Sequence, residues 1–320
     1  MRVLDGCRIA VALACLGGAG LGASCASTGH DAGPVPAYDV PLAPGAPGKF
    51  ILFGDSRKTL GQEFWRPRFD AERLLVIRAL ADEAPAFILN TGDLVGAGSD
   101  PAQWRDFHRE NEPIFSKRIP YFPGLGNHEY MWDKSEGLAH TFASFPRLKG
   151  RTWYDIPFPP ALVLVLDSNF GELEDAENGA QERWLEETLA AAERDDAIRH
   201  VILAFHHAPY TNAVAHGGSR AARQRFLSRK TPKVHVVLTG HVHSYERFHI
   251  DGVQCVVSGG GGAPLMQLDT EKPRHKDEFR GPAYRPFHYC RFTIDGPRLL
   301  CDVVMLQDRA WTRVDGFECR

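Results

Sequence analysis

The sequence has no excess of positive charge, no internal repeat and no long apolar run beyond its first 25 residues. Its formal net charge is −3 over 320 residues, which gives no support for a role as a nucleic-acid scaffold. Residues 26–48 are rich in Pro, Gly, Ala and Ser without a hydrophobic period, and they predict a disordered tether. The rest of the chain, 49–320, contains no second linker and predicts one domain.

The one apolar run, residues 9–23, is too short and glycine-rich for a membrane span, which needs about 20 apolar residues. It follows a short positive region, so residues 1–25 predict a signal peptide and an exported protein. Small residues at 22–24 precede Cys25, as in bacterial lipoprotein cleavage sites. Two outcomes stay open: a protein tethered to the outer membrane through a lipidated Cys25, or ordinary secretion to the periplasm or beyond.

Cysteine is scarce in the predicted mature chain. If Cys25 is lipidated, four cysteines remain: Cys255, Cys290, Cys301 and Cys319. In an oxidising compartment four cysteines can form two disulfides with three possible connectivities. Cys290 and Cys301 flank a predicted hairpin and are the first candidate pair. The alternative is four buried free thiols.

Six short apolar runs, each ending in a polar cluster, predict buried strands, because they are apolar on both faces and too short for helices. These runs are 50–53, 87–89, 121–125, 162–166, 201–205 and 234–238. Helical patterns at 70–83, 101–111 and 181–194 lie between them and favour α/β layers. Later runs at 253–257, 288–294 and 299–306 predict hairpin-like strands in a mixed sheet or in a second sheet packed on the first.

The polar residues at these strand ends are of the kinds that bind metal ions. They are Asp55, Asp93, Asn127, His207, His241 and His243. In open α/β sheets, ligands bind beyond the carboxyl ends of strands. Carboxylate, amide and imidazole groups together suit Fe, Mn or Zn, and a carboxylate shared by two ions is typical of two-metal hydrolases.

The motifs that contain these residues resemble those of the calcineurin-like metallophosphoesterase superfamily, in order along residues 50–265. They are GDSR at 54–57, GDLV at 92–95, GNHE at 126–129, HHAPY at 206–210 and GHVHSYER at 240–247. The last two motifs are most similar to the purple acid phosphatase branch. The resemblance implies an α/β (α+β layered) fold of two packed mixed β-sheets flanked by helices.

The resemblance also implies a role for each residue. Asp93 would bridge two cations, Asp55 and His243 would hold the first, and the second would be held by Asn127, His207 and His241. His128 would protonate the leaving oxygen or steady charge on the phosphoryl group, with Glu129 orienting it. The implied reaction is hydrolysis of a small phosphomonoester by a metal-bound hydroxide.

Two positions depart from the family pattern. Arg57 stands where most members have a histidine two residues after the first aspartate, and Gly96 stands where purple acid phosphatases have a tyrosine. The first cation is therefore one protein ligand short. The Arg57 guanidinium is suited to a bidentate grip on phosphate oxygens, and the alternative is a surface ion pair.

Other interpretations stay open. Phosphodiesters, including cyclic nucleotides, are the alternative substrates, and the missing ligand motivates an inactive binding or scaffold protein on the same fold. His206 is expected to point away from the site and to serve packing or support. His216, in the loop 213–219, is a candidate substrate contact. No helix pattern opens after the glycines at 259–262, so they do not predict a nucleotide-binding loop.

Overall fold

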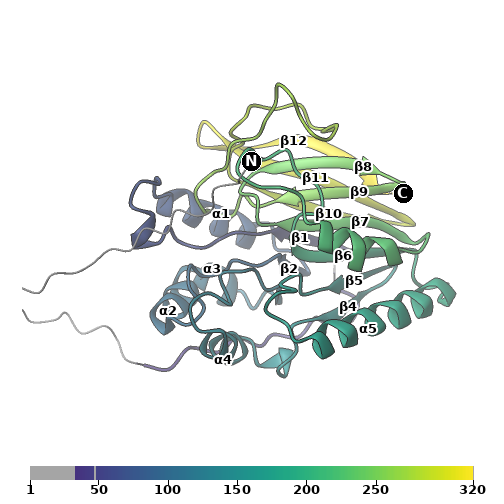
Figure 1. Ribbon diagram of the computed structural model, residues 1–320, viewed down its shortest axis with the longest axis horizontal. Coiled ribbons are helices and arrows are strands. Elements are labelled where there is room, and N and C mark those ends of the chain that lie inside the picture. Colours follow the sequence, from purple (N-terminus) through teal and green to yellow (C-terminus); the bar gives the residue numbers. More distant parts are fainter. Residues whose placement is uncertain (1–32, 47, 320) are drawn as a thin grey trace, which may run out of the picture. The chain divides into compact units, whose positions relative to one another are not determined.

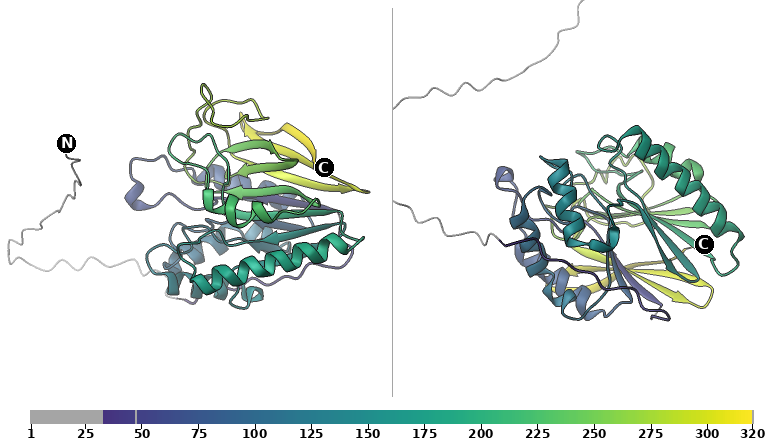
Figure 2. Two further views of the ribbon diagram at one scale, coloured as in Figure 1. Left: turned by 45° about the vertical axis from the view of Figure 1, so that its right-hand side comes forward. Right: turned by 90° about the horizontal axis from the view of Figure 1, so that it is seen from below.

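The computed structural model describes residues 33–46 and 48–319. The predicted signal peptide, Cys25 and residues 26–32 lie outside the described residues. In the described part, two six-stranded mixed sheets pack face to face, and helices cover their outer sides (Figures 1 and 2). This arrangement confirms the predicted fold class.

The first sheet joins early strands to the C-terminal part of the chain. Its strands, in order across the sheet, are β12 (Ala310–Cys319), β11 (Arg298–Gln307), β10 (His288–Asp295), β1 (Lys49–Phe53), β2 (Phe87–Asn90) and β3 (Tyr121–Pro123). The pairs β1–β2 and β2–β3 are parallel, while β10 to β12 run antiparallel to their neighbours. The carboxyl ends of β1, β2 and β3 therefore lie at one edge of the sheet.

The second sheet repeats this design with the middle of the chain. Its order is β4 (Tyr154–Phe158), β5 (Ala161–Val165), β6 (His200–His207), β7 (Val234–Gly240), β9 (Val253–Ser258) and β8 (Tyr245–Ile250). Strands β5, β6, β7 and β9 are parallel, and β4 and β8 are antiparallel edge strands. The ends of β6 and β7 thus also meet at one edge.

The core between the sheets comes from the apolar runs of the sequence. Phe50 stacks on Phe87 and Phe292 in the first sheet, with ring centroids 4.8 and 4.9 Å apart. Ile202 and Val236 face them from the second sheet in the same buried cluster. Because such strands are buried on both faces, they carry apolar residues continuously rather than in alternation.

Helices cover the outer faces. They are α1 (Asp70–Asp82), α2 (Pro101–Glu110), α3 (Glu112–Phe115), α4 (Lys134–Ser144), α5 (Asp175–Arg194) and α6 (Arg220–Arg225), with short 3₁₀ turns η1 (Gly61–Glu63), η2 (Pro146–Leu148) and η3 (Leu227–Arg229). Helices α1 to α3 share a buried cluster with the first sheet, while α5 packs on the second. Across residues 33–46 and 48–319, we find no helix with the length and apolar character needed to cross a membrane.

Residues 33–46, which lie in the segment predicted as a disordered tether (26–48), pack against the domain. Tyr38 is buried, its hydroxyl donates to the Ile119 carbonyl at 2.7 Å, and its ring stacks on Phe115 at 3.9 Å. The tether prediction does not hold for this described part of the segment. The prediction of disorder rested on the Pro- and Gly-rich composition. Composition does not reveal that a single aromatic residue anchors the segment to the domain.

The four described cysteines are buried free thiols, so the candidate disulfide between Cys290 and Cys301 is not formed. Cys290 lies opposite Val303 in the β10–β11 ladder. Cys301 lies opposite Phe292, which places the two cysteines two positions out of register. The sequence placed both cysteines on one hairpin correctly, but it did not determine their register.

An ion-pair cluster at the end of α1 joins the helix to the first sheet. The Glu83 carboxylate accepts hydrogen bonds from Tyr289 Oη at 2.8 Å, Arg291 Nε at 2.9 Å and Lys49 Nζ at 3.2 Å. Burial raises the pKa of Glu83, but the hydrogen bonds from Arg291 and Tyr289 outweigh it and lower this pKa to about 2. The ionised carboxylate therefore stabilises the fold.

We expect Glu83→Gln to lower the free energy of unfolding at pH 7 by roughly 1–2 kcal/mol, after allowance for the solvent-screened partners. The folded-state pKa lies below the unfolded value of about 4.3, so this contribution is present above that pH and is lost as the pH falls toward 2. Urea titrations from pH 7 to pH 3 should show the difference between the two proteins shrinking. Glu187→Gln, on the exposed side of α5, is the control. A difference independent of pH would contradict the assignment.

Candidate metal centre

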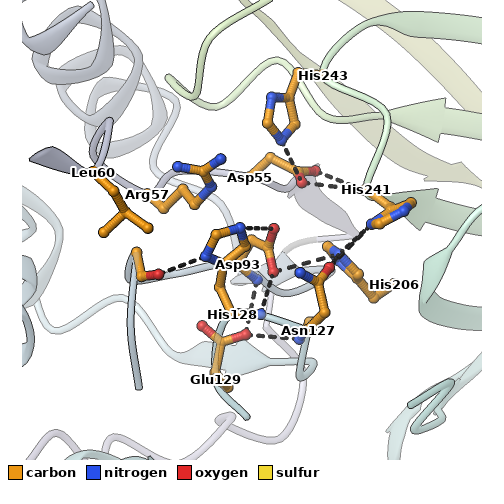
Figure 3. A network of polar contacts seen from close by, with 12 residues as sticks. Asp55, Arg57, Leu60, Asp93, Asn127, His128, Glu129, His206, His241 and His243 are labelled. Atoms are coloured by element: carbon orange, nitrogen blue, oxygen red, sulfur yellow. Dashed lines mark hydrogen bonds and ion pairs between the residues drawn. The ribbon is translucent and has the colours of Figure 1, made fainter. Parts of the chain in front are cut away.

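The polar residues at the strand ends of the two sheets converge in space (Figure 3). Asp55 follows β1, Asp93 follows β2 and His243 follows β7. One ligand atom from each of these three buried residues lies within 4.8 Å of the others. The structure thus brings together the two carboxylates and the imidazole that the sequence assigned to the first cation.

His243 has its tautomer fixed by the backbone. Its Nδ1 lies 2.7 Å from the Pro264 carbonyl oxygen and donates to it. The other ring nitrogen, Nε2, then carries a lone pair and lies 3.4 Å from Asp55 Oδ1. Two acceptors that face one another at this distance repel unless a cation lies between them, so this geometry fits a metal ligand.

A second group of acceptors lies beside Asp93. His206 donates Nδ1–H to the Thr91 carbonyl at 3.0 Å, which leaves Nε2 as an acceptor. That Nε2 lies 3.4 Å from Asp93 Oδ1 and 3.1 Å from Asn127 Oδ1. His241 Nδ1 lies 3.1 Å from the same Asn127 oxygen. Asn127, His206, His241 and Asp93 therefore converge as a mixed N and O donor set suited to a divalent or trivalent cation.

His206 occupies the place at this group that the sequence assigned to His207. The expectation that His206 points away from the site is wrong, and the alternation of side chains along β6 explains why. Ile202 and Ala204 face the first sheet in the buried cluster between the sheets, and His206 is the next residue on that face. It therefore points toward Asn127 in the turn after β3.

His207 lies beside His241 and Ser168 at the edge of this group. Its Nδ1 is 2.9 Å from Ser168 Oγ, which also accepts a hydrogen bond from the His207 backbone N–H at 3.0 Å. Its ring centroid is 4.5 Å from that of His241. A ligand role for His207 stays a prediction, and the geometry favours support of the neighbouring imidazoles.

The turns that carry the site are held in an uncommon backbone conformation. Asp55, Asp93 and His241 have φ values of 59°, 56° and 67°, in the left-handed region that is uncommon for residues other than glycine. The His241 N–H donates to Asp55 Oδ2 at 3.0 Å and joins the two sheets. Strain of this kind concentrates at functional sites, where the surrounding structure maintains it.

Glu129 supports the site differently from the prediction. Its carboxylate accepts backbone N–H groups of Asp93 at 2.9 Å, Leu94 at 2.8 Å and Gly126 at 2.7 Å. It therefore ties the turn after β2 to the turn after β3 and makes no described contact that orients His128. The Gly96 carbonyl does this instead, since it lies 2.5 Å from His128 Nδ1.

The electrostatics keep Asp93 ionised and the imidazoles of His207 and His241 neutral. Burial raises the pKa of Asp93, but the nearby His206 and His128 outweigh it, so this pKa is lowered. Burial and the neighbouring His206 lower the pKa of His207 to about 3 and that of His241 to about 2. Neutral imidazole and ionised carboxylate are the forms that bind metal ions.

The sequence model of the calcineurin-like phosphoesterase family matches residues 49–245. The chain belongs to this family. This match confirms the resemblance on which the site residues were predicted.

Several relatives are purple acid phosphatases. "Probable inactive purple acid phosphatase 1" of Arabidopsis thaliana is 25% identical over 269 residues, which cover 70% of this chain and 42% of the relative. Purple acid phosphatase 22 of the same plant is 28% identical over 259 residues, with 74% and 56% covered. The solved purple acid phosphatase PPD1 of yellow lupin aligns with a TM-score of 0.65 at 21% identity, covering 85% of this chain and 54% of the lupin chain. The chain thus spans about half the length of these relatives.

The first departure from the family pattern, Arg57, lies inside the site. It is 3% exposed and pairs with both carboxylate oxygens of Glu63, with Nη1 and Nη2 at 2.8 and 3.0 Å. Its Nε is buried without a hydrogen-bond partner. Arg57 lines a cavity of about 240 Å³ together with Asp93, His128 and His241. A surface ion pair therefore does not describe it.

The second departure, Gly96, has no room for a side chain. A Cβ atom there would lie 2.6 Å from Leu60 Cδ2 and 2.8 Å from Gln103 Oε1. Leu60 from the loop after Arg57 fills the space that the tyrosine of purple acid phosphatases would need (Figure 3). The two departures are thus coupled, since one loop supplies both Arg57 and Leu60.

His216, the candidate substrate contact, also lines the cavity. Its ring centroid lies 5.0 Å from that of His241. Burial and the neighbouring His243 and Arg66 lower the pKa of His216. Among the described residues, no fourth His, Cys, Asp or Glu joins the group of Asp55, Asp93 and His243.

Proposed function

We propose that this protein hydrolyses phosphomonoesters with a centre of two cations drawn from Fe, Mn and Zn. One observation carries the proposal: aspartate, asparagine and histidine acceptors converge on Asp93, and the backbone N–H groups of His128 and His241 satisfy only some of them. Asp55, Asp93 and His243 would hold one ion, and Asp93, Asn127, His206 and His241 would hold the other. His207, the ligand predicted from the sequence, would support the second group.

The bound ions would supply an activated water and neutralise charge that develops on phosphorus. The residues of the chain do the rest. The Arg57 side chain lines the cavity, and its cationic guanidinium suits an interaction with a phosphate oxygen. Its partner Glu63, whose pKa burial raises but the Arg57 hydrogen bonds lower to about 2, keeps the guanidinium in place. His216 would contact the substrate from the opposite loop.

His128 would deliver a proton to the leaving oxygen from its doubly protonated form. Nδ1–H is donated to the Gly96 carbonyl, so the proton to be transferred is the one on Nε2, which lies 3.8 Å from Asp93 Oδ2 beside the proposed ions. His128→Ala should lower kcat about 10²-fold while the metal content measured by plasma emission stays at the wild-type value. His140→Ala, on the nearby helix α4, should leave both unchanged. Loss of metal in His128→Ala would make His128 a ligand and overturn its assignment as an acid.

A substrate panel tests the proposed function. Phenyl phosphate and bis(4-nitrophenyl) phosphate, assayed with Mn, Zn and Fe supplied in turn, separate monoester from diester hydrolysis. We expect faster turnover of the monoester. A preference for the diester would support the phosphodiesterase alternative. An intact fold that binds no metal and turns over neither ester would support the inactive scaffold, the alternative motivated by the missing ligand at Arg57.

We also propose that the protein is exported, since residues 1–25 read as a signal peptide. Lipidation of Cys25 would tether it to the outer membrane, while cleavage without lipidation would release it to the periplasm or medium. Small phosphorylated compounds outside the cytoplasm are the partners that this proposal implies. Mass spectrometry of the mature N-terminus decides between the two routes, because a lipidated cysteine adds acyl chains, and an intact N-terminus would refute both.

A further inference from the structure

Large apolar side chains that face solvent occur on the loops that line the cavity. Among the described residues, six such side chains are exposed: Phe64 (85%), Trp65 (68%), Trp132 (66%), Val214 (60%), Tyr284 (54%) and Leu75 (38%). All except Leu75 lie on loops that also carry cavity-lining residues or touch such a loop. Exposed aromatic groups at the rim of a polar cleft mark a surface that binds apolar ligand groups.

The loop after β1 carries the two most exposed of these rings. Phe64 and Trp65 stand between Glu63 and Arg66, and both of those charged residues line the cavity. The two rings contact each other edge to face, with centroids 5.3 Å apart. This loop therefore presents charge to the cavity and aromatic surface just outside it.

Trp132 forms a second part of the rim. It follows Met131, which lines the cavity, and its backbone φ of 71° is an outlier for so bulky a residue. The conformation holds the indole outward, 66% exposed, rather than in the core. Strain retained in this way points to function more than to packing.

The cavity has apolar as well as polar walls. Its buried residues Asp93 and His128 are polar, while Met131 and Met266 add partly buried apolar surface. Methionine side chains adapt to apolar groups of varied shape. The cavity volume of about 240 Å³ is below the roughly 300–1,000 Å³ of pockets that enclose a whole ligand. A phosphoester seated at the ions must therefore extend its organic group past the rim.

We propose that this rim selects phosphomonoesters with a large apolar or aromatic organic group, which lies against Phe64, Trp65 and Trp132 while the phosphoryl group occupies the cavity. The inference rests on the proposed hydrolysis and names its substrate class. The cationic Arg57 and Arg66 attract the phosphate, and the aromatic surface buries the group attached to it. The predicted ligand is thus an amphiphilic phosphoester in solution.

The test compares two esters that share a leaving-group chemistry, phenyl phosphate and 4-butylphenyl phosphate, below the concentration at which the longer one aggregates. The wild-type protein should favour the butyl ester about tenfold in kcat/KM, mainly through KM, because partial burial of four carbon atoms strengthens binding uniformly. The double variant Phe64→Ala/Trp65→Ala should reduce this preference below about twofold, and Trp132→Ala should reduce it in part. Leu75→Ala, which changes an exposed apolar residue on α1 away from the cavity, should retain it.

Other outcomes would overturn the inference. In one such outcome the preference is unchanged in the double variant, and in another kcat/KM falls equally for both esters. Either result would mean that the rim does not bind the organic group. If the preference persists while the variant loses sedimentation with phosphatidylglycerol vesicles, the rim is a membrane contact. If it persists while the variant's mass by light scattering falls from a dimer to a monomer, the rim is a contact between copies.

A binding measurement separates this inference from the proposed hydrolysis. Calorimetry with phenylphosphonate and 4-butylphenylphosphonate, which resist hydrolysis, should show the same tenfold difference in affinity. Wild-type protein that turns over neither ester but retains this difference would refute the hydrolysis and support the rim. Protein that turns over both esters equally would refute the rim and leave the hydrolysis standing.

Discussion

Replacing Asp93 by Asn should abolish both the metal centre and the activity. The substitution keeps the size of the side chain and one oxygen, but it removes the only carboxylate that reaches both groups of acceptors. Two neighbouring cations without a shared anion repel each other strongly. We expect fewer than one metal ion per chain and a loss in kcat of more than about 10³-fold.

A second readout keeps this prediction separate from loss of folding. Ligands that bind only the native state raise the melting temperature, so added Mn or Zn should stabilise the wild-type protein and leave Asp93→Asn unchanged. Asparagine tolerates the positive φ at this position better than most residues, and metal-free Asp93→Asn should fold. Asp155→Asn, an exposed aspartate on β4, is the control. Full metal content in the Asp93 variant would refute the bridging role.

The sequence predicted the interior strands well because their physical signal is strong. Runs such as Val234–Leu238 are apolar on both faces, and only a strand buried in a sheet or between layers satisfies them. The edge strands β4, β8 and β12 were not predicted as strands. They alternate between buried and exposed residues or carry charges, as in β12, in which only Cys319 is buried. Such patterns are also compatible with loops.

Helix α4 shows a different limit. It begins at its N-cap Asp133, whose side chain accepts the Glu136 N–H at 3.0 Å. Its sequence contains Gly137 and few apolar residues at helical spacing, so no amphipathic period revealed it. The helix forms because Gly137 lets it approach the turn after β3, where a Cβ would lie 2.1 Å from the Glu129 carbonyl oxygen. This tertiary contact cannot be read from local composition.

The candidate site shows which kinds of information a motif carries. The motifs identified the turns that converge, because residue types at strand ends are fixed by chemistry and by topology together. They did not identify which atoms meet. Glu129 was expected to orient His128 but accepts backbone N–H groups, and this depends on how two turns pack. The choice between His206 and His207 depends on which face of β6 points toward the first sheet, and this is a property of the packing between the sheets and not of β6 alone.

The two adjacent histidines at the end of β6 should respond differently to substitution. His206→Ala should lose about one of two metal ions and about 10³-fold in kcat, because His206 Nε2 lies 3.4 Å from Asp93 Oδ1 and 3.1 Å from Asn127 Oδ1. Removal of a ligand leaves too few coordinating atoms to hold the cation. Metal content and kcat are measured on the same preparation.

His207→Ala is the matched variant, since it removes an imidazole one residue away. We expect both ions to stay bound and kcat to fall by roughly tenfold or less, the usual effect of a group that supports a ligand. His206→Gln adds a further check, because glutamine restores side-chain volume without an imidazole nitrogen and should not restore the metal. Metal loss in His207→Ala together with full metal in His206→Ala would reverse the assignment.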